Sequence, residues 1–260
     1  MMNIRSYAKV NLFLLVKPLN KKNKLHDIKS CFALHKDLFD EIIIEHTNKN
    51  IDEVIYYWEK KQITIKDCLI TKTLKILREN NYIKDRYKII VNKNIPVSSG
   101  LGGGSSNAAS IVKALVKTNK KFKPNKKLID ILHNISSDMI FFLYDYDYAI
   151  VKNFGKKVKK HKFKNELKFD ILLTKINCET SNVFKTFDTL NLKNLKKSSI
   201  KKELTKIKKK QYNLLVNNLL VACLNTYPSI SEIYNRINKE DQNYLLSGSG
   251  GTFFKISEVL

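Results

Sequence analysis

Apolar runs separated by polar segments predict alternating strands and helices along the first half of the chain. The run Ala8–Val16 is apolar almost throughout and ends at Lys17-Pro18, which indicates a buried strand. Apolar and β-branched runs predict further strands at Cys31–Leu34, at Asp40–His46, twice within 51–65, and at Tyr87–Val91. Apolar positions three or four residues apart predict helices at Asp67–Asn80, with Asp67 as the expected N-cap, and at Ser105–Thr118.

The second half of the chain is more polar, and its predicted elements are shorter. A helix is expected at Leu128–Ile135, and a pair of strands at Phe141–Leu143 and Tyr148–Val151. The basic segment Gly155–Asn165 is expected to be a hairpin or linker where a second domain begins. Later predictions are a strand at Phe169–Thr174, a solvated and partly helical segment at Asn194–Lys210, helices at Leu214–Asn225 and Ile230–Ile237, and a strand at Thr252–Ile256.

This mixture of strands and helices lacks the strict alternation of a doubly wound sheet, so the predicted fold class is α+β. The predicted domains are residues 1–154 and residues 155–260, because the basic segment separates them. With 43% hydrophobic residues the chain can form a substantial core, which excludes a disordered protein.

The formal net charge of +24 allows two interpretations. A polyanion such as nucleic acid could be the partner, or lysine could simply fill solvated faces. Lysine far outnumbers arginine, whereas specific recognition of bases and phosphates favours arginine. We therefore expect no nucleic-acid partner, and a basic nucleic-acid-binding module remains the alternative.

Cysteine spacing and the N-terminal segment bear on the cellular compartment. Cys31, Cys68, Cys178 and Cys223 are far apart and form no CxxC pair, so neither a zinc site nor a disulfide framework is indicated. The apolar run near the N-terminus is too short for a membrane span and lacks a cleavage site. We expect a cytoplasmic enzyme with free thiols and no membrane partner.

A glycine-rich segment, Gly100–Asn107, leads from a predicted strand directly into a predicted helix. Glycines let backbone N–H groups approach an anion closely, and a helix N-terminus adds unpaired N–H groups and a positive dipole end. The hydroxyls of Ser105 and Ser106 can bind phosphate oxygens or a magnesium ion. The segment lacks the Gly-Lys-Ser/Thr of a Walker A loop, so it indicates another kind of ATP-phosphate cradle.

Three segments, in order along the chain, resemble motifs of the GHMP kinases. Pro96–Ala109 resembles the phosphate motif of that family, Ala8–Leu12 its first strand, and Leu246–Gly251 its C-terminal glycine motif. The resemblance implies two domains, the second ferredoxin-like, with the active site in the cleft between them. It also implies ATP-dependent phosphorylation of a small-molecule alcohol, with Mg²⁺ as cofactor.

Ala8–Leu14, His26 and Ser137–Leu143 most resemble the branch of that family that phosphorylates the 2-hydroxyl of a cytidyl-diphosphate sugar alcohol in the non-mevalonate route to isoprenoid precursors. A kinase of the homoserine or mevalonate type remains an alternative. The expected partner is the small-molecule cytidyl-diphosphate substrate, and the expected state is a monomer or weak homodimer.

The resemblance implies roles for individual residues. Asp138 would be the general base, and Lys9 its charged neighbour near the transferred phosphoryl group. The expected ATP-binding residues are Lys93, Pro96, Gly100, Leu101, Gly102, Gly103, Gly104, Ser105, Ser106 and Asn107. The expected substrate-binding residues are Asn11, His26, Thr180, Phe184, Gly248 and Ser249, of which His26 and Phe184 would hold the cytosine ring. The residues of a metal site are not indicated.

Structural roles are the alternatives for several of these residues. Asp138 could cap a helix, His26 could be merely exposed in a polar loop, and Phe184 could belong to the core. The Leu246–Gly251 segment could be an ordinary hairpin. Leu25 stands where the branch usually has a tyrosine that stacks on cytosine, so an apolar side chain could hold one face of the base.

Overall fold

The computed structural model describes residues 1–22, 24–116, 122–190 and 197–258. The chain forms two compact units and passes between them several times. Unit 1 consists of Met1–Ala8, His35–Pro96 and Gly102–Tyr146, and unit 2 of Lys9–Leu34, Val97–Leu101 and Asp147–Leu260. The predicted domain boundary after residue 154 stays a prediction.

Two long paired strands, β1 (Met2–Asn20) and β2 (Leu25–Thr47), run through both units. The strands predicted at Cys31–Leu34 and Asp40–His46 are both parts of β2. Their separation was wrong because the polar residues at 35–37 interrupt the apolar pattern while the backbone stays extended. Apolar patterning therefore located the buried parts of this strand but not its continuity.

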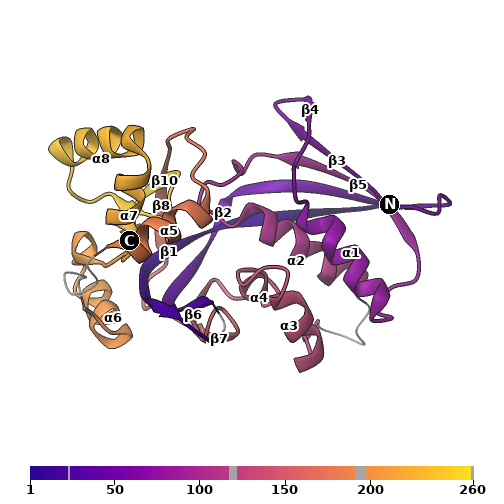
Figure 1. Cartoon of the computed structure of the whole chain (residues 1–260), viewed down its shortest axis with the longest axis horizontal. Helices are drawn as coiled ribbons and strands as arrows, with labels where there is room; N and C mark the ends of the chain where they lie inside the picture. Colours follow the sequence, from indigo (N-terminus) through magenta and orange to yellow (C-terminus); the bar gives the residue numbers. More distant parts are fainter. Residues whose placement is uncertain (23, 117–121, 191–196, 259–260) are drawn as a thin grey trace. The chain divides into compact units, whose positions relative to one another are not determined.

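The sheet of unit 1 confirms the other strands predicted before residue 96. It contains β3 (Glu53–Trp58), β4 (Lys61–Ile63) and β5 (Arg86–Lys93), in the order β4-β3-β5-β2. β5 is antiparallel to β2 and parallel to β3. Two helices, α1 (Leu69–Glu79) and α2 (Gly103–Leu115), lie together on one side of these strands (Figure 1). The face of α1 formed by Ile70, Thr73, Leu74 and Leu77 is buried, as the spacing predicts.

The N-terminal ends of both helices differ from the sequence prediction. The N-cap of α1 is Cys68, whose sulfur accepts a hydrogen bond from Thr71 N at 3.4 Å, and not Asp67. Helix α2 begins at Gly103 because Gly102 takes a left-handed conformation, with φ 73°, as its N-cap. The predicted C-terminal end of this helix, Thr118, lies outside the described residues.

Two further helices complete unit 1. The helix α3 (Lys126–His133) confirms a prediction, whereas α4 (Met139–Phe142) replaces the strand predicted at Phe141–Leu143. Every residue of α4 is buried, and a short, wholly apolar run has no periodicity that distinguishes a buried helix from a buried strand.

Unit 2 contains two groups of strands. The strand β6 (Tyr148–Lys152) confirms the strand predicted at Tyr148–Val151, and it pairs with β2 and with β7 (Lys157–His161). The basic segment predicted as a hairpin or linker thus supplies only the second strand of this hairpin. A separate antiparallel sheet has the order β8-β10-β9, from β8 (Leu167–Leu173), β9 (Leu245–Leu246) and β10 (Thr252–Glu258). These strands confirm the predictions at Phe169–Thr174 and Thr252–Ile256.

The helices of unit 2 are α5 (Thr180–Thr189), α6 (Ile200–Lys208), α7 (Leu220–Thr226) and α8 (Pro228–Glu240), with a short 3-10 helix, η2 (Tyr212–Leu214). Helices α5, α7 and α8 share a core that includes Val183, Phe187, Cys223 and Ile230, together with Phe253 of β10. The sequence pattern predicted α8 and some helix in the region of α6, but it did not predict α5. Residues 194–196 of the predicted solvated segment lie outside the described chain.

The helix predicted at Leu214–Asn225 begins only at Leu220. The residues before it bind β1 instead: Leu14 N donates to Val216 O at 2.8 Å, and Asn218 N donates to Leu14 O at 2.8 Å. These long-range hydrogen bonds outweigh the local helical pattern. Among the described residues, we find no helix with the length and apolar character needed to cross a membrane.

Candidate active site

The first part of the glycine-rich segment lies directly against the C-terminal glycine motif, and both belong to unit 2. A Cβ atom at Gly100 would lie 2.3 Å from Ser247 O and 2.7 Å from Gly250 O, and one at Gly248 would lie 3.0 Å from Gly100 O. The hydroxyl of Ser247 also donates to Gly100 O at 3.2 Å. Only glycine permits this approach, particularly at Gly100, whose φ is +76°. The two motifs therefore form one backbone platform.

Lys9 lies beside this platform on β1. Its side chain is buried, and Nζ donates to Asn11 Oδ1 at 2.5 Å and to Gly100 O at 2.9 Å. The ammonium group also lies 4.9 Å from the centre of the Phe32 ring. A buried ammonium is costly without such partners. These contacts hold the charge of Lys9 at the platform in a single position.

Asn11 is held from the other side. Its Nδ2 donates to Ser30 Oγ at 3.1 Å, and Ser30 Oγ donates to Phe13 O at 2.5 Å. The amide oxygen of Asn11 thus faces Lys9, and its orientation is fixed by the hydroxyl on β2. The structure brings together the predicted residues Lys9, Asn11, Gly100 and Gly248.

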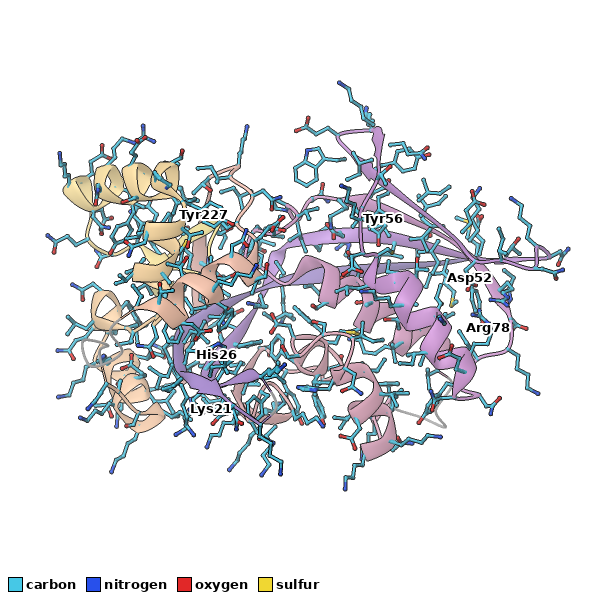
Figure 2. The ribbon with its side chains drawn as sticks, in the orientation of Figure 1. Lys21, His26, Asp52, Tyr56, Arg78 and Tyr227 are labelled. Carbon is cyan, nitrogen blue, oxygen red and sulfur yellow. The ribbon has the colours of Figure 1, made fainter. Side chains whose placement is uncertain are left out.

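The other predicted substrate-binding residues of unit 2 lie on or beside α5. The hydroxyls of Thr180 and Ser249 are 2.8 Å apart, which links the start of α5 to the glycine motif. The rings of His26 and Phe184 are stacked with their centres 4.8 Å apart and an interplanar angle of 30° (Figure 2 labels His26). His26 is therefore packed against Phe184 rather than left in an open loop.

The ring nitrogens of His26 both face oxygen atoms. Nδ1 is 2.9 Å from Lys17 O, and Nε2 is 3.4 Å from a carboxylate oxygen of Asp188. Asp188 was not among the predicted site residues, because α5 was not predicted. Asp188 follows Phe184 by four residues, so the two side chains share one face of the helix and both reach His26. Leu25, at the position of the expected tyrosine, is exposed.

The second part of the glycine-rich segment forms the N-terminus of α2 in unit 1. A Cβ at Gly103 would lie 2.8 Å from Ile95 Cγ2, so glycine lets the helix start close to the end of β5. Within the described chain, no acidic residue lies in the first turn of α2. A free helix N-terminus of this kind presents unpaired N–H groups and the positive end of the helix dipole, both of which attract phosphate.

Two serines of the cradle are held by other hydroxyls. Ser105 Oγ is 2.7 Å from Ser136 Oγ, and Ser6 Oγ donates to Ser106 Oγ at 2.7 Å. The first contact brings the segment that carries Asp138 to the first turn of α2. Asp138 is half-buried at the N-terminus of α4, and within the described chain its side chain makes no capping hydrogen bond to that helix. The alternative role of Asp138 as a helix cap is therefore not supported.

Lys93 and Asn107, both predicted to bind ATP, are buried in a polar network around Asp40. Lys93 Nζ lies 2.7 Å from Asp40 Oδ2, and Asn107 Nδ2 donates to the same oxygen at 2.9 Å. The other carboxylate oxygen accepts hydrogen bonds from Asn94 N at 2.7 Å and Ile95 N at 2.8 Å. This burial favours a supporting role for Lys93 and Asn107 beneath the cradle over direct contact with ATP.

Asp40 is a supporting residue of the site that the sequence pattern did not predict. Its position as the first residue of a buried apolar strand was the available signal, because a buried carboxylate is unusual without a partner. The remaining predicted ATP-binding residues differ in their exposure to solvent. Pro96 is half-buried, Leu101 is buried, and Gly104 is exposed at the start of α2. Gly104 thus leaves the helix N-terminus accessible.

Known proteins match this chain over nearly its whole length. The model of the GHMP kinases N terminal domain matches residues 68–146. The 4-diphosphocytidyl-2-C-methyl-D-erythritol kinase of Ureaplasma parvum serovar 3 is 34% identical over 258 residues, covering 98% of this chain and 95% of that protein. A protein of the same name from Campylobacter jejuni is 29% identical over 268 residues, covering 97% of this chain and 99% of that protein.

Solved structures agree on the fold. A crystal structure of 4-(cytidine 5'-diphospho)-2C-methyl-D-erythritol kinase has a TM-score of 0.69 and 21% identity, covering 98% of this chain and 90% of that chain. A crystal structure of homoserine kinase from Cytophaga hutchinsonii has a TM-score of 0.60 and 13% identity, and the match covers 98% of this chain and 85% of that chain. The predicted α+β fold of the GHMP kinases is confirmed. The 34% identity to the first relative, over 98% of this chain, shows that the chain belongs to the 4-diphosphocytidyl-2-C-methyl-D-erythritol kinase family of the GHMP kinases.

Proposed function

We propose that the chain transfers the γ-phosphoryl group of ATP to the 2-hydroxyl of 4-diphosphocytidyl-2-C-methyl-D-erythritol, in the non-mevalonate route to isoprenoid precursors. The observation that carries this proposal is the 34% identity, over 98% of the chain, to a kinase named for that substrate. The buried ammonium of Lys9, fixed between Asn11 and Gly100, also supports a phosphoryl transfer, because it places a positive charge where the transferred group would carry negative charge.

The nucleotide binds through its phosphates. The N-terminus of α2 supplies the N–H groups and the dipole, and the hydroxyl of Ser105 supplies a further polar contact, whereas the buried Ser106 hydroxyl, bonded to Ser6, supports the helix from beneath. Among the described residues, no cluster of three or more His, Cys, Asp and Glu side chains could hold a metal ion. Mg²⁺ would bind mainly through the oxygens of the triphosphate and would neutralise their charge. The hydroxyl of Ser105, at the first turn of α2, is the protein group that would hold it.

The reaction needs positioning, proton acceptance and charge stabilisation. The oxygen of the 2-hydroxyl attacks the γ-phosphorus, the bond to the β–γ bridging oxygen breaks, and ADP leaves. Asp138 accepts the hydroxyl proton, because an aspartate within hydrogen-bond reach is a competent general base. The ammonium of Lys9 stabilises the negative charge that develops on oxygen in the transition state.

The cytidyl group binds beside α5. Phe184 presents an aromatic face that can stack on a pyrimidine, and stacking of this kind contributes about 1–3 kcal/mol per base. His26 lies against that ring, and Thr180 and Ser249 lie near the diphosphate or methylerythritol group. Leu25 covers one face of the base in place of an aromatic side chain. We also propose that the enzyme works in the cytoplasm as a monomer or weak homodimer and binds no nucleic acid.

Initial rates of ADP formation test this function. The purified chain with MgATP is expected to form ADP with 4-diphosphocytidyl-2-C-methyl-D-erythritol and to be inactive with homoserine or mevalonate. The Lys9→Met variant controls for contaminating kinases. If the rate with mevalonate or homoserine equals the rate with 4-diphosphocytidyl-2-C-methyl-D-erythritol, the proposed substrate is wrong. An absence of ADP, together with salt-dependent binding of oligonucleotides on filters, would favour the nucleic-acid alternative.

A further inference from the structure

One buried carboxylate, that of Asp40 on β2, binds the chain on both sides of the segment 96–106, which contains the cradle. Before this segment, Oδ1 accepts the backbone N–H groups of Asn94 at 2.7 Å and Ile95 at 2.8 Å. After it, Nδ2 of Asn107, on α2, donates to Oδ2 at 2.9 Å. The segment is therefore a loop whose two ends are fixed to the same side chain.

The charge of this carboxylate is balanced by Lys93. Nζ of Lys93 lies 2.7 Å from Oδ2 of Asp40, and both side chains are buried. A buried carboxylate without a partner would be costly, and beneath an anion site it would also repel phosphate. Because the ammonium group faces Asp40, its positive charge compensates that carboxylate rather than a bound nucleotide.

The orientation of the Asn107 amide is set by the same carboxylate. Its Nδ2 donates both to Asp40 and to Ser6 Oγ, the latter at 3.1 Å. Its Oδ1 is buried and has no hydrogen-bond partner within the described part of the chain. An unpaired buried oxygen costs free energy, but a carboxylate can only accept hydrogen bonds, so the amide must turn its N–H groups toward Asp40.

The start of α2 lies between the two ends that Asp40 holds. On one side, a Cβ at Gly103 would lie only 2.8 Å from Cγ2 of Ile95, whose N–H group is bonded to Asp40. On the other side, Asn107 belongs to α2 itself. The unpaired N–H groups of the first turn are the groups that attract phosphate. Their position therefore depends on Asp40.

A second carboxylate, Asp52, binds the opposite end of β5 in the same way. Its Oδ1 accepts Tyr87 N and Nη2 of Arg78, both at 3.0 Å (Figure 2 labels Asp52 and Arg78). Tyr87 and Lys93 are six residues apart on β5, and a strand rises about 3.3 Å per residue, so the two ends are about 20 Å apart. Asp52 is thus a matched control that is remote from the segment 96–106.

Beyond its effect on stability, we propose that Asp40 is a positioning residue for ATP. It sets the affinity for the triphosphate, without contacting the nucleotide, by fixing the N–H groups at the start of α2. The inference rests on the proposed function, because it takes these N–H groups as the phosphate site. ATP binding then depends on Asp40, whereas proton acceptance and charge stabilisation depend on Asp138 and Lys9.

Calorimetry with MgATP and the whole chain, without an alcohol substrate, tests the inference. In Asp40→Asn, an amide group faces the donors of Asn107 and Lys93, so the second end is released. Kd should rise about tenfold, as expected for the loss of a hydrogen bond to a charged group. Asp52→Asn carries the same change of charge at a distant site and should stay within about twofold of the wild type. Urea denaturation checks that both variants are folded at the temperature of the measurement.

A double-mutant cycle tests whether Asp40 acts through Asn107. Asn107→Ala removes the same hydrogen bond from the other side, so Asp40→Asn/Asn107→Ala should raise Kd no further than Asp40→Asn alone. If Asp40→Asn fails to fold, Asp40→Ala/Lys93→Met, which leaves no unpaired buried charge, takes its place. Its Kd should also rise about tenfold, because the second end is released there as well.

Initial rates separate positioning from a general loss of structure. In Asp40→Asn, the KM for ATP should rise about tenfold while kcat stays within about threefold of the wild type. An unchanged Kd in Asp40→Asn, an equal rise in Asp52→Asn, or additive effects of the changes at 40 and 107 would overturn the inference.

Failure of the proposed function gives a different result. A wild type that binds MgATP but forms no ADP with 4-diphosphocytidyl-2-C-methyl-D-erythritol would refute the proposed substrate, and the affinities of the variants would still decide the role of Asp40. A wild type that binds no MgATP would refute the cradle and this inference together.

Discussion

The side-chain nitrogen of Lys9 lies 2.9 Å from the carbonyl oxygen of Gly100. This hydrogen bond joins the first motif of the chain to the phosphate motif, 91 residues later. Gly100 O also accepts the hydroxyl of Ser247, so a single carbonyl oxygen connects all three motifs that resemble those of the GHMP kinases. The arrangement places a fixed positive charge next to the glycine-rich platform.

Replacement of Lys9 tests the role of this charge. Lys9→Met is expected to lower kcat by about 10²–10³-fold, because a preorganised group that stabilises transition-state charge is lost. The free energy of unfolding should change by less than about 1 kcal/mol, since loss of the hydrogen bonds is offset by removal of a buried charge. Lys17→Met, an exposed change on the same strand, is the control and should leave kcat unchanged. A near-normal kcat in Lys9→Met would remove Lys9 from the mechanism.

Glycine substitutions test whether the two motifs form one platform. Gly100→Ala is expected to lower the free energy of unfolding by about 1–3 kcal/mol, because the methyl group would meet two backbone oxygens and φ is positive. Gly104→Ala is the matched control. Its methyl group would lie 3.5 Å from Leu69 Cδ1 on a helix, where alanine is favoured by about 0.5–1 kcal/mol. Chemical denaturation measures the free energy of unfolding of both variants. If Gly100→Ala is as stable as Gly104→Ala, the two motifs are not in contact.

Asp138→Asn tests the general base. The asparagine keeps the shape of the side chain and cannot accept the hydroxyl proton, so kcat should fall about 10²–10⁴-fold. ATP affinity, measured by calorimetry, should be unchanged, because no binding role is assigned to the carboxylate. An unchanged kcat would mean that another group accepts the proton.

The network around Asp40 is expected to support the cradle through stability. Asp40→Ala should lower the free energy of unfolding by about 3–5 kcal/mol, because the ammonium of Lys93 would stay buried without its carboxylate. The double variant Asp40→Ala/Lys93→Met should recover part of this loss in a double-mutant cycle followed by urea denaturation. Additive effects of the two changes would show that the ion pair carries no coupling energy.

Local pattern predicted most of the strands, and it singled out the glycine-rich segment, whose role as a phosphate cradle stays a prediction. The glycine-rich segment was informative because four glycines and two serines before a helix have few structural explanations. Errors arose where local pattern is ambiguous or where distant contacts decide. The run at residues 139–142 is apolar at every position, so it carries no period, and it forms the helix α4 rather than a strand.

Long-range hydrogen bonds explain what the sequence could not predict. Asn217 is held in a β-bridge to Leu14 instead of a helix, and its side-chain amide donates to Leu246 O and Gly248 O, both at 2.9 Å. The same contacts make Asn217 a support of the glycine motif, a role that nothing in its local sequence indicates. Helix α5 was missed for a different reason: apolar residues are sparse in it, and only the spacing of Val183 and Phe187 marks its buried face.

A crystal structure with a non-hydrolysable ATP analogue and 4-diphosphocytidyl-2-C-methyl-D-erythritol tests the central claim most directly. The account predicts that the phosphates contact backbone N–H groups within residues 100–107, and that the Asp138 carboxylate lies within hydrogen-bond distance of the 2-hydroxyl. Phosphates bound at any other segment, or a 2-hydroxyl that faces neither Asp138 nor Lys9, would contradict it.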